Sequence, residues 1–269
     1  MRAGIAQKIA SAPLRMGGDS RSGSCLFPRT RAGGMADDAT LSWAVVPAAG
    51  LGTRMSGLHA SGCKELVEVA GCSMLERTIR ELEQAGIENI VVVSSPAKPA
   101  IDAALEGRGV HIVHQSEPVG LVDAVACARP LIGDEPMLVA LPDGMFPDLN
   151  PSAALLKTWQ AMTTLVTVRT ESPWGELLHD TGRVTSMDDN RILDLADKRK
   201  DQPFPLGEHR ITGRYVWTAD FWEFAEKGEV EALRVLASEG ILRACPVNTA
   251  YVDVGNPEGY AYAQSILNR

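Results

Sequence analysis

Residues 45–64, VVPAAGLGTRMSGLHASGCK, decide the fold of this chain. A short apolar run over residues 43–46 predicts a buried strand, and a loop of small residues follows it up to Thr53. Glycines in a loop that directly follows a strand let backbone N–H groups approach a phosphate closely. Arg54 adds a planar guanidinium and Lys64 a mobile ammonium, and both groups suit phosphate oxygens. The stretch therefore predicts a strand and a loop that bind the phosphates of a nucleoside triphosphate.

Two better-known phosphate-binding loops do not fit this stretch. The dinucleotide fingerprint requires a third glycine where Met55 stands. The Walker pattern is broken because Cys63 separates Gly62 from Lys64, and no Ser or Thr follows the lysine to hold magnesium. A redox enzyme on a dinucleotide-binding fold is therefore the least favoured alternative.

Strand-like and helix-like segments alternate along the rest of the chain. We expect strands at residues 41–46, 90–94, 110–114, 137–141, 163–170, 176–179, 183–186, 212–217 and 250–254. We expect helices at residues 74–85, 99–105, 120–128, 152–160, 219–226, 230–238 and 257–267. Alternation through short loops is typical of a parallel sheet that helices cover on both faces. The predicted fold class is α/β, a Rossmann-like, mostly parallel mixed sheet with helices on both faces.

The composition is that of an ordinary globular chain. It has 269 residues, of which 45% are hydrophobic and 22% charged, enough for one sizeable α/β core. The net charge of -8 argues against nucleic acid as a partner, and no apolar run approaches the length of a membrane span. The five cysteines are odd in number and form no C-x-x-C pair, which argues against a disulfide framework or a zinc site. A reducing, cytoplasmic setting fits this cysteine usage.

The start of the chain differs from the rest. Its first 34 residues hold six Lys or Arg and one acidic residue, Asp19, without sustained periodicity. We expect residues 1–40 to form a disordered basic leader and residues 41–269 to form one domain. An Arg-rich, acid-poor leader is compatible with a transit peptide. The alternative is that translation starts at Met35.

Two carboxylates far apart in the sequence suggest a metal site. Asp143 follows the expected strand at residues 137–141, and ligands of such sheets bind beyond the carboxyl ends of strands. Mg²⁺ takes one or two carboxylates and completes its shell with substrate phosphates. Asp253 stands in an apolar strand, where an unpaired charge is costly, so a cation partner is expected. The alternatives are a turn-forming Asp-Gly pair for Asp143, and an edge-strand or capping carboxylate for Asp253.

Two further pairs of residues suit a base and a sugar phosphate. Gln115 can donate to and accept from a base edge, and Gly120 would let the backbone approach that base. Lys198 could contact a substrate phosphate while Asp197 accepts from substrate hydroxyls. The alternatives are a polar loop before a helix for the first pair and a solvated basic cluster at residues 198–200 for the second.

Taken in order, these motifs resemble the sugar-1-phosphate nucleotidyltransferases, especially the bacterial uridylyl- and thymidylyltransferases that act on glucose 1-phosphate. The resemblance covers residues 43–262. It rests on PAAGLGTR at 47–54, KEL at 64–66, QSEPVGL at 115–121, LPDG at 141–144, DK at 197–198, GRY at 213–215 and DVGNPEGY at 253–260. The chain departs from the family pattern where members usually or often have proline, at Gly57, Cys63, Glu68, Ser73 and Arg199, and it has Asp197 where they usually have glutamate.

The resemblance implies a role for each motif. The nucleotide would be bound by Ala49, Gly50, Gly52, Thr53, Gln115 and Gly120. The sugar phosphate would be bound by Gly175, Asp197 and Lys198. Catalysis would rest on Arg54, Lys64 and Asp143, and Mg²⁺ would be held by Asp143 and Asp253.

The reaction that follows from this resemblance is nucleotidyl transfer. A nucleoside triphosphate, with UTP or dTTP favoured, would react with a sugar 1-phosphate, with glucose 1-phosphate favoured, to give an NDP-sugar and pyrophosphate. Two alternatives stay open. One is a cytidylyltransferase for a non-sugar phosphate, and the other is a catalytically inactive nucleotide-sugar-binding protein, which the missing prolines and Arg199 suggest. The subunit assembly cannot be predicted.

Overall fold

The computed structural model describes residues 41–52, 55, 62–169, 182–196 and 208–267. The expected leader at residues 1–40 and the expected strand at 176–179 lie outside these residues. Among the described helices, none combines the length and the apolarity that a membrane crossing requires.

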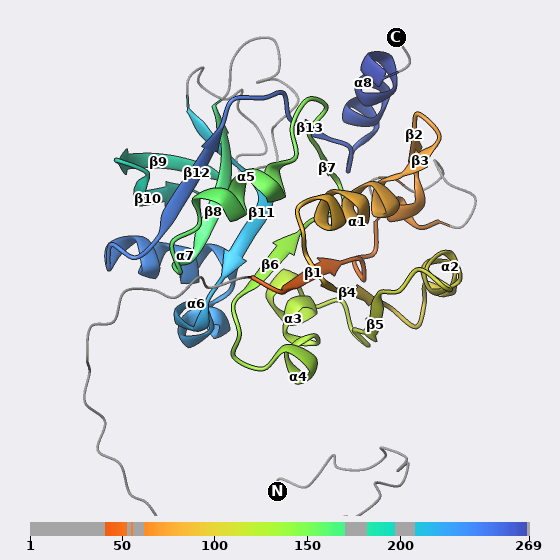
Figure 1. The fold of residues 1–269 in the computed structure, drawn as a ribbon, viewed down its shortest axis with the longest axis horizontal. Helices are drawn as coiled ribbons and strands as arrows, with labels where there is room; N and C mark the ends of the chain where they lie inside the picture. Colours follow the sequence, from red (N-terminus) through yellow and green to blue (C-terminus); the bar gives the residue numbers. More distant parts are fainter. Residues whose placement is uncertain (1–40, 53–54, 56–61, 170–181, 197–207, 268–269) are drawn as a thin grey trace, which may run out of the picture. The chain divides into compact units, whose positions relative to one another are not determined.

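A nine-stranded sheet runs through the described part of the chain (Figure 1). Its spatial order is β5-β4-β1-β6-β11-β8-β12-β10-β9. The strands are β1 (Trp43–Pro47), β4 (Asn89–Ser94), β5 (His111–His114), β6 (Met137–Ala140), β8 (Thr164–Arg169), β9 (Arg183–Asp188), β10 (Arg191–Ala196), β11 (His209–Trp217) and β12 (Arg243–Val247). Strands β5, β4, β1 and β6 are parallel, as are β8 and β12, whereas β11, β10 and β9 pair antiparallel to their neighbours. The predicted mostly parallel, mixed sheet is confirmed.

Helices cover both faces of the sheet because successive side chains of each strand point to opposite sides. The helices are α1 (Met74–Gln84), α2 (Pro99–Ala104), α3 (Leu121–Ala126), α4 (Arg129–Ile132), α5 (Pro151–Thr158), α6 (Ala219–Phe224), α7 (Glu229–Ser238) and α8 (Pro257–Leu267). In β1, Val45 joins the core under α3, α4, α6 and α7, while Ala44 and Val46 join the core under α1, α2 and α5. In the described ranges, 3-10 turns span Lys64–Leu66 and Ala225–Lys227. The expected helices on both faces are thus present.

Two small sheets stand apart from the large one. Strands β2 (Glu68–Val69) and β3 (Cys72–Ser73) form a hairpin, and β7 (Gly144–Met145) pairs with β13 (Val252–Asp253). A third, smaller core joins these sheets to α8 through Val69, Met145, Val252 and Ala263. The last segment of the chain is thereby anchored beside the carboxyl end of β6.

The structure differs from the expected elements at several points: β2, β3 and β7 were not expected, the strand expected at 250–254 is only the two-residue β13, and three other differences have a local cause. The helix expected at 120–128 ends at Ala126, and α4 begins at Arg129 because Pro130 cannot continue a helix but fits its first turn. The strand β12 was missed because Pro246 interrupts its apolar pattern. The strand β10 was missed because its pairing with β9 shifts register on both sides of Asp194, which breaks the alternation.

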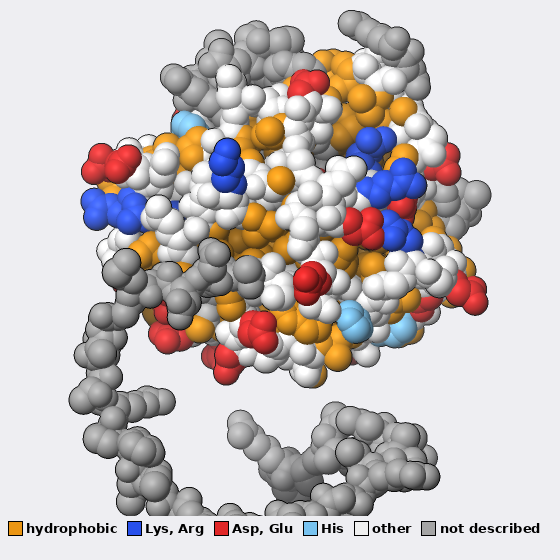
Figure 2. Space-filling model, in the orientation of Figure 1, with side chains coloured by type: hydrophobic (Ala, Val, Ile, Leu, Met, Phe, Trp, Pro, Cys, Tyr) orange, Lys and Arg blue, Asp and Glu red, His pale blue; other side chains and the backbone are white. Residues whose placement is uncertain are grey.

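Charged side chains of both signs lie close together on one part of the surface. Figure 2 shows basic and acidic side chains gathered together over the region of α1. Arg108 there binds Glu76 and Glu83, and Arg80 binds Glu76. This face therefore presents mixed charge rather than a broad patch of one sign.

Candidate active site

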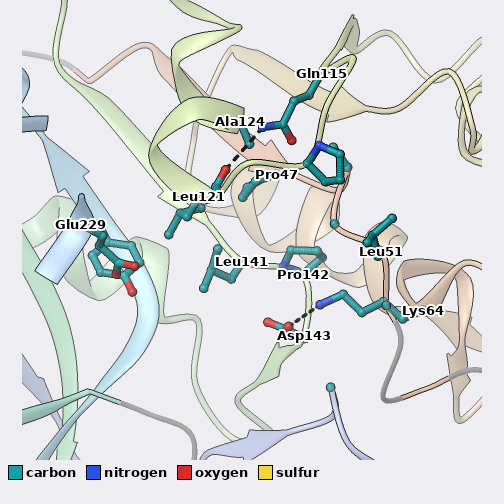
Figure 3. A pocket seen from close by; sticks show the side chains of 17 residues that line it. Pro47, Leu51, Lys64, Gln115, Leu121, Ala124, Leu141, Pro142, Asp143 and Glu229 are labelled. Atoms are coloured by element: carbon teal, nitrogen blue, oxygen red, sulfur yellow. Dashed lines mark hydrogen bonds and ion pairs between the residues drawn. The ribbon is translucent and has the colours of Figure 1, made fainter. Parts of the chain in front are cut away.

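A cavity of about 440 Å³ opens beyond the carboxyl ends of β1 and β6 (Figure 3). It lies where parallel sheets bind ligands, at the edge where the loops after several strands meet. Seven predicted site residues line it, namely Ala49, Gly50, Gly52, Lys64, Gln115, Gly120 and Asp143. The other predicted residues Thr53, Arg54, Gly175, Asp197 and Lys198 lie outside the described residues. The structure therefore brings together the described residues expected to bind phosphate and base.

The pairing of β7 with β13 brings Asp253 to Asp143. Asp253 is opposite Gly144 in this antiparallel ladder, and the amide of Val254 donates to the carbonyl of Asp143 at 2.8 Å. The Asp253 side chain is buried, and its Oδ1 accepts from the amide of Gly255 at 2.8 Å. Two residues that are far apart in the sequence are thus neighbours in the fold, and one of them, Asp143, lines the cavity.

Both carboxylates lie next to Gly255. A Cβ at Gly255 would stand 2.9 Å from Oδ1 of Asp253 and 3.1 Å from Oδ2 of Asp143, so the two oxygens are close to one another. Among the described residues, no cluster of three or more His, Cys, Asp or Glu side chains could hold a metal unaided. Two carboxylate oxygens nevertheless match the preference of Mg²⁺, which usually keeps waters and takes phosphate oxygens for the rest of its shell.

Lys64 forms the positive part of the site. Its Nζ lies 2.7 Å from Oδ2 of Asp143, and both side chains are about a fifth to a quarter exposed. The negative charge of Asp143 raises the pKa of Lys64 above its ordinary value, although burial acts in the opposite direction. Glu65 and Asp253 raise it further. Lys64 is therefore a permanent cation at neutral pH, placed beside the expected metal ligands.

A buried ion pair supports the loop after β1. Lys98, at the start of α2, donates from Nζ to Glu65 at 2.9 Å and to the carbonyl of Ala48 at 2.9 Å. Side-chain exposure is 9% for Lys98 and 1% for Glu65. This pair ties the segment that carries Lys64 to the first residues of the loop after β1.

Arg214 holds the turn that carries Asp143. It is fully buried in β11, and its guanidinium binds Glu81 of α1 through two bonds of 2.8 and 2.7 Å. The same group donates to the carbonyl of Leu141 at 2.7 Å and to that of Gly144 at 3.3 Å. Burial lowers the pKa of Arg214, but attraction and hydrogen bonds from Glu81 outweigh that effect and leave it raised. Arg214 therefore fixes the backbone on both sides of Asp143.

Gln115 follows β5 and closes the cavity on the side of α3. Its backbone amide donates to the carbonyl of Ser94 at 2.9 Å, and its side chain is almost fully buried. The side-chain Nε2 donates to Asp123 at 2.7 Å. The residue expected to read a base is therefore held rigidly.

Two polar side chains of the cavity, those of Glu229 and Tyr215, were not predicted as site residues. Glu229, at the start of α7, lies across the cavity from Lys64 (Figure 3). Tyr215, in β11, also lines the cavity. Burial and the hydrogen-bonded carboxylate of Glu229 raise the pKa of Tyr215 well above its ordinary value. Tyr215 belongs to the GRY motif, which could have signalled it. Glu229 has no motif around it, and only the packing of α7 places it in the cavity.

Comparison with known proteins agrees with this geometry. The family model described as "Nucleotidyl transferase" matches residues 43–268. The UTP--glucose-1-phosphate uridylyltransferase of Salmonella typhimurium is 27% identical over 82% of this chain and 90% of that protein. The protein of the same name from Bacillus subtilis is 27% identical over 70% of this chain and 75% of that protein.

Solved structures share the fold. The UTP-bound UGPase from Acinetobacter baumannii is 23% identical with a TM-score of 0.69, over 84% of this chain and 93% of that one. A UDP-glucose pyrophosphorylase complexed with UDP-glucose is 21% identical with a TM-score of 0.72, over 85% of this chain and 99% of that one. The predicted family resemblance and fold class are confirmed.

Proposed function

The chain belongs to the nucleotidyl transferase family and is a nucleotidyltransferase, and from that premise we propose its reaction. It transfers a uridylyl or thymidylyl group from UTP or dTTP to a sugar 1-phosphate, with glucose 1-phosphate favoured, and releases pyrophosphate. The convergence of Lys64, Asp143 and Asp253 beside the loop after β1 is the observation that carries this proposal. The names of the relatives from Salmonella typhimurium and Bacillus subtilis support the choice of UTP and glucose 1-phosphate.

The transfer needs no protein nucleophile. An oxygen of the sugar 1-phosphate attacks the α-phosphorus of the triphosphate in line, the new P–O bond forms, and the bond to the β-phosphate oxygen breaks. The leaving pyrophosphate keeps the electron pair of the broken bond. Catalysis then rests on positioning and on offsetting negative charge.

The expected site residues divide these tasks. Gly50 and Gly52 cradle the triphosphate, and Lys64, together with Arg54, stabilises the leaving pyrophosphate. Mg²⁺ held by Asp143 and Asp253 would supply charge neutralisation at the α-phosphate. Gln115 and Gly120 bind the base, while Gly175, Asp197 and Lys198 bind the sugar phosphate.

Two further assignments belong to this proposal. Residues 41–269 form the catalytic domain, since the family match lies within them. The setting is cytoplasmic, which the free state of the four described cysteines, Cys63, Cys72, Cys127 and Cys245, supports.

Pyrophosphate release tests the proposal. UTP, dTTP, CTP, ATP and GTP are each offered with Mg²⁺ and with glucose 1-phosphate, other sugar 1-phosphates or non-sugar phosphates such as choline phosphate. We expect release with UTP or dTTP and a sugar 1-phosphate. Release only with CTP and a non-sugar phosphate would establish a cytidylyltransferase instead. No release in a folded protein that still binds a nucleotide would support the binding-protein alternative.

A further inference from the structure

The side-chain amide of Gln115 has only one orientation that its neighbours accept. Its Nε2 donates to Oδ2 of Asp123 at 2.7 Å. The same nitrogen donates to the carbonyl of Gly120 at 3.4 Å (Figure 3). A carboxylate and a carbonyl can only accept hydrogen bonds. If the amide flipped, its oxygen would face both of these acceptors, and the closer one carries a charge. The nitrogen is therefore turned toward α3.

This orientation determines what Gln115 offers to a ligand. Both N–H groups of the amide are directed at Asp123 and Gly120, so only Oε1 is left for the cavity that Gln115 lines. A side chain that could both donate and accept has become an acceptor. The exposed Asp123 lies in the first turn of α3 and does not itself line the cavity.

We propose that Asp123 is a positioning residue that sets the pyrimidine choice of this enzyme. By holding Gln115 as an acceptor, it favours uracil or thymine, whose N3 carries a hydrogen, over cytosine, whose N3 carries a lone pair. The inference rests on the proposed function and deepens it by naming a residue that sets the choice of base. A buried acceptor that faces a lone pair loses its bond, so UTP is favoured over CTP by about tenfold to a hundredfold in kcat/KM.

Substitution of Asp123 tests the proposal through a ratio. The measurement is kcat/KM for pyrophosphate release with UTP divided by that with CTP, with one sugar 1-phosphate and Mg²⁺. In Asp123→Lys the side chain at this position can only donate, so the flipped orientation of the Gln115 amide is favoured. The ratio should then fall by about tenfold, mainly through the KM values of the two nucleotides. Asp123→Asn keeps an acceptor oxygen at the same place and retains most of the ratio. The new lysine attracts the triphosphates of UTP and CTP equally, so this attraction cancels in the ratio.

A matched control separates the base effect from the charge change. Asp220 is an exposed acidic residue in the first turn of α6, which is also six residues long, and it does not line the cavity. Asp220→Lys makes the same charge change at a similar place in a helix, and the ratio stays at the wild-type value. The urea midpoint of each variant reports whether the fold is intact.

The outcomes distinguish this inference from the proposed function. If Asp123→Lys slows both nucleotides equally and leaves the ratio unchanged, Asp123 does not position Gln115 for base choice, and the inference is wrong. If wild type releases no pyrophosphate from any of the nucleotides offered, the proposed function fails instead. Calorimetric titration of the same proteins with UTP and with CTP then tests the inference, since the ratio of the two Kd values must shift in Asp123→Lys alone.

Discussion

Replacing Arg214 by methionine should destabilise the protein and slow turnover together. Glu81 would keep only the hydroxyl of Ser152, at 2.5 Å, as a side-chain donor. The Glu81 side chain is 13% exposed and that of Arg214 is 0% exposed. Breaking a buried ion pair by removing one partner costs about 3–5 kcal/mol. Because Glu81 keeps one bond and some contact with water, we expect the lower end, about 3 kcal/mol.

This loss can be measured by urea unfolding and by thermal unfolding. A loss of about 3 kcal/mol corresponds to a fall in Tm of about 6–12 °C for a chain of this size. Arg108 provides the control, because it also binds two carboxylates, Glu76 and Glu83, but at the surface. Arg108→Met should cost about 1 kcal/mol or less. An Arg214→Met variant that unfolds within about 0.5 kcal/mol of wild type would refute the reasoning.

A double variant separates stability from positioning. Arg214→Met with Glu81→Met removes the uncompensated charge, so most of the lost stability should return. The carbonyls of Leu141 and Gly144 still lack their donor, so the turn with Asp143 stays loose. Turnover should then remain about a hundredfold below wild type. Full recovery of turnover would show that Arg214 does not position Asp143.

Three further predictions concern residues around the cavity. Lys98→Met leaves the 1% exposed Glu65 uncompensated, and the urea midpoint should report a loss of about 3–5 kcal/mol; an unchanged midpoint would contradict this. A Cβ at Gly259 would collide with the carbonyl oxygen of Asp253, so Gly259→Ala should lower kcat at least about tenfold, and wild-type kcat would count against the assignment of Asp253. The pKa of Lys64 is raised, so its ion pair stabilises the fold fully below the unfolded value of 10.5 and is lost only as pH rises through the higher folded value. The difference in urea midpoint between wild type and Lys64→Met should therefore stay constant from pH 7 to about 10, and a decline within that range would contradict the raised pKa.

The part of the site that follows the parallel strands could be predicted from the sequence. The loop after β1, Gln115 after β5 and Asp143 after β6 all lie beyond carboxyl ends of strands, and those ends meet at one edge. The burial of Asp253 was expected from its apolar neighbours. The short β7–β13 ladder that brings it to Asp143 could not be predicted, because two-residue strands leave no periodic pattern.

Residues whose role depends on packing between distant segments were not predictable. Glu229 enters the cavity only because α7 packs over the face that Tyr215 shares. The residues next to Arg214 in the sequence indicate only a strand. They do not show that its guanidinium binds both Glu81 of α1 and the carbonyl of Leu141 in the turn before β7. The hydrogen bond from Gln115 to Asp123 joins the residue after β5 to the first turn of α3. It therefore depends on how these two segments pack together.

Dependence of turnover on the two carboxylates and on Mg²⁺ tests the central claim most directly. Pyrophosphate release from UTP and glucose 1-phosphate is measured in wild type, Asp143→Asn and Asp253→Asn, across a range of Mg²⁺ and after chelation. We predict that wild type requires Mg²⁺ and that each variant loses at least about a hundredfold in rate while still unfolding in one cooperative urea transition. Turnover retained in both variants, or undiminished after chelation, would contradict the account.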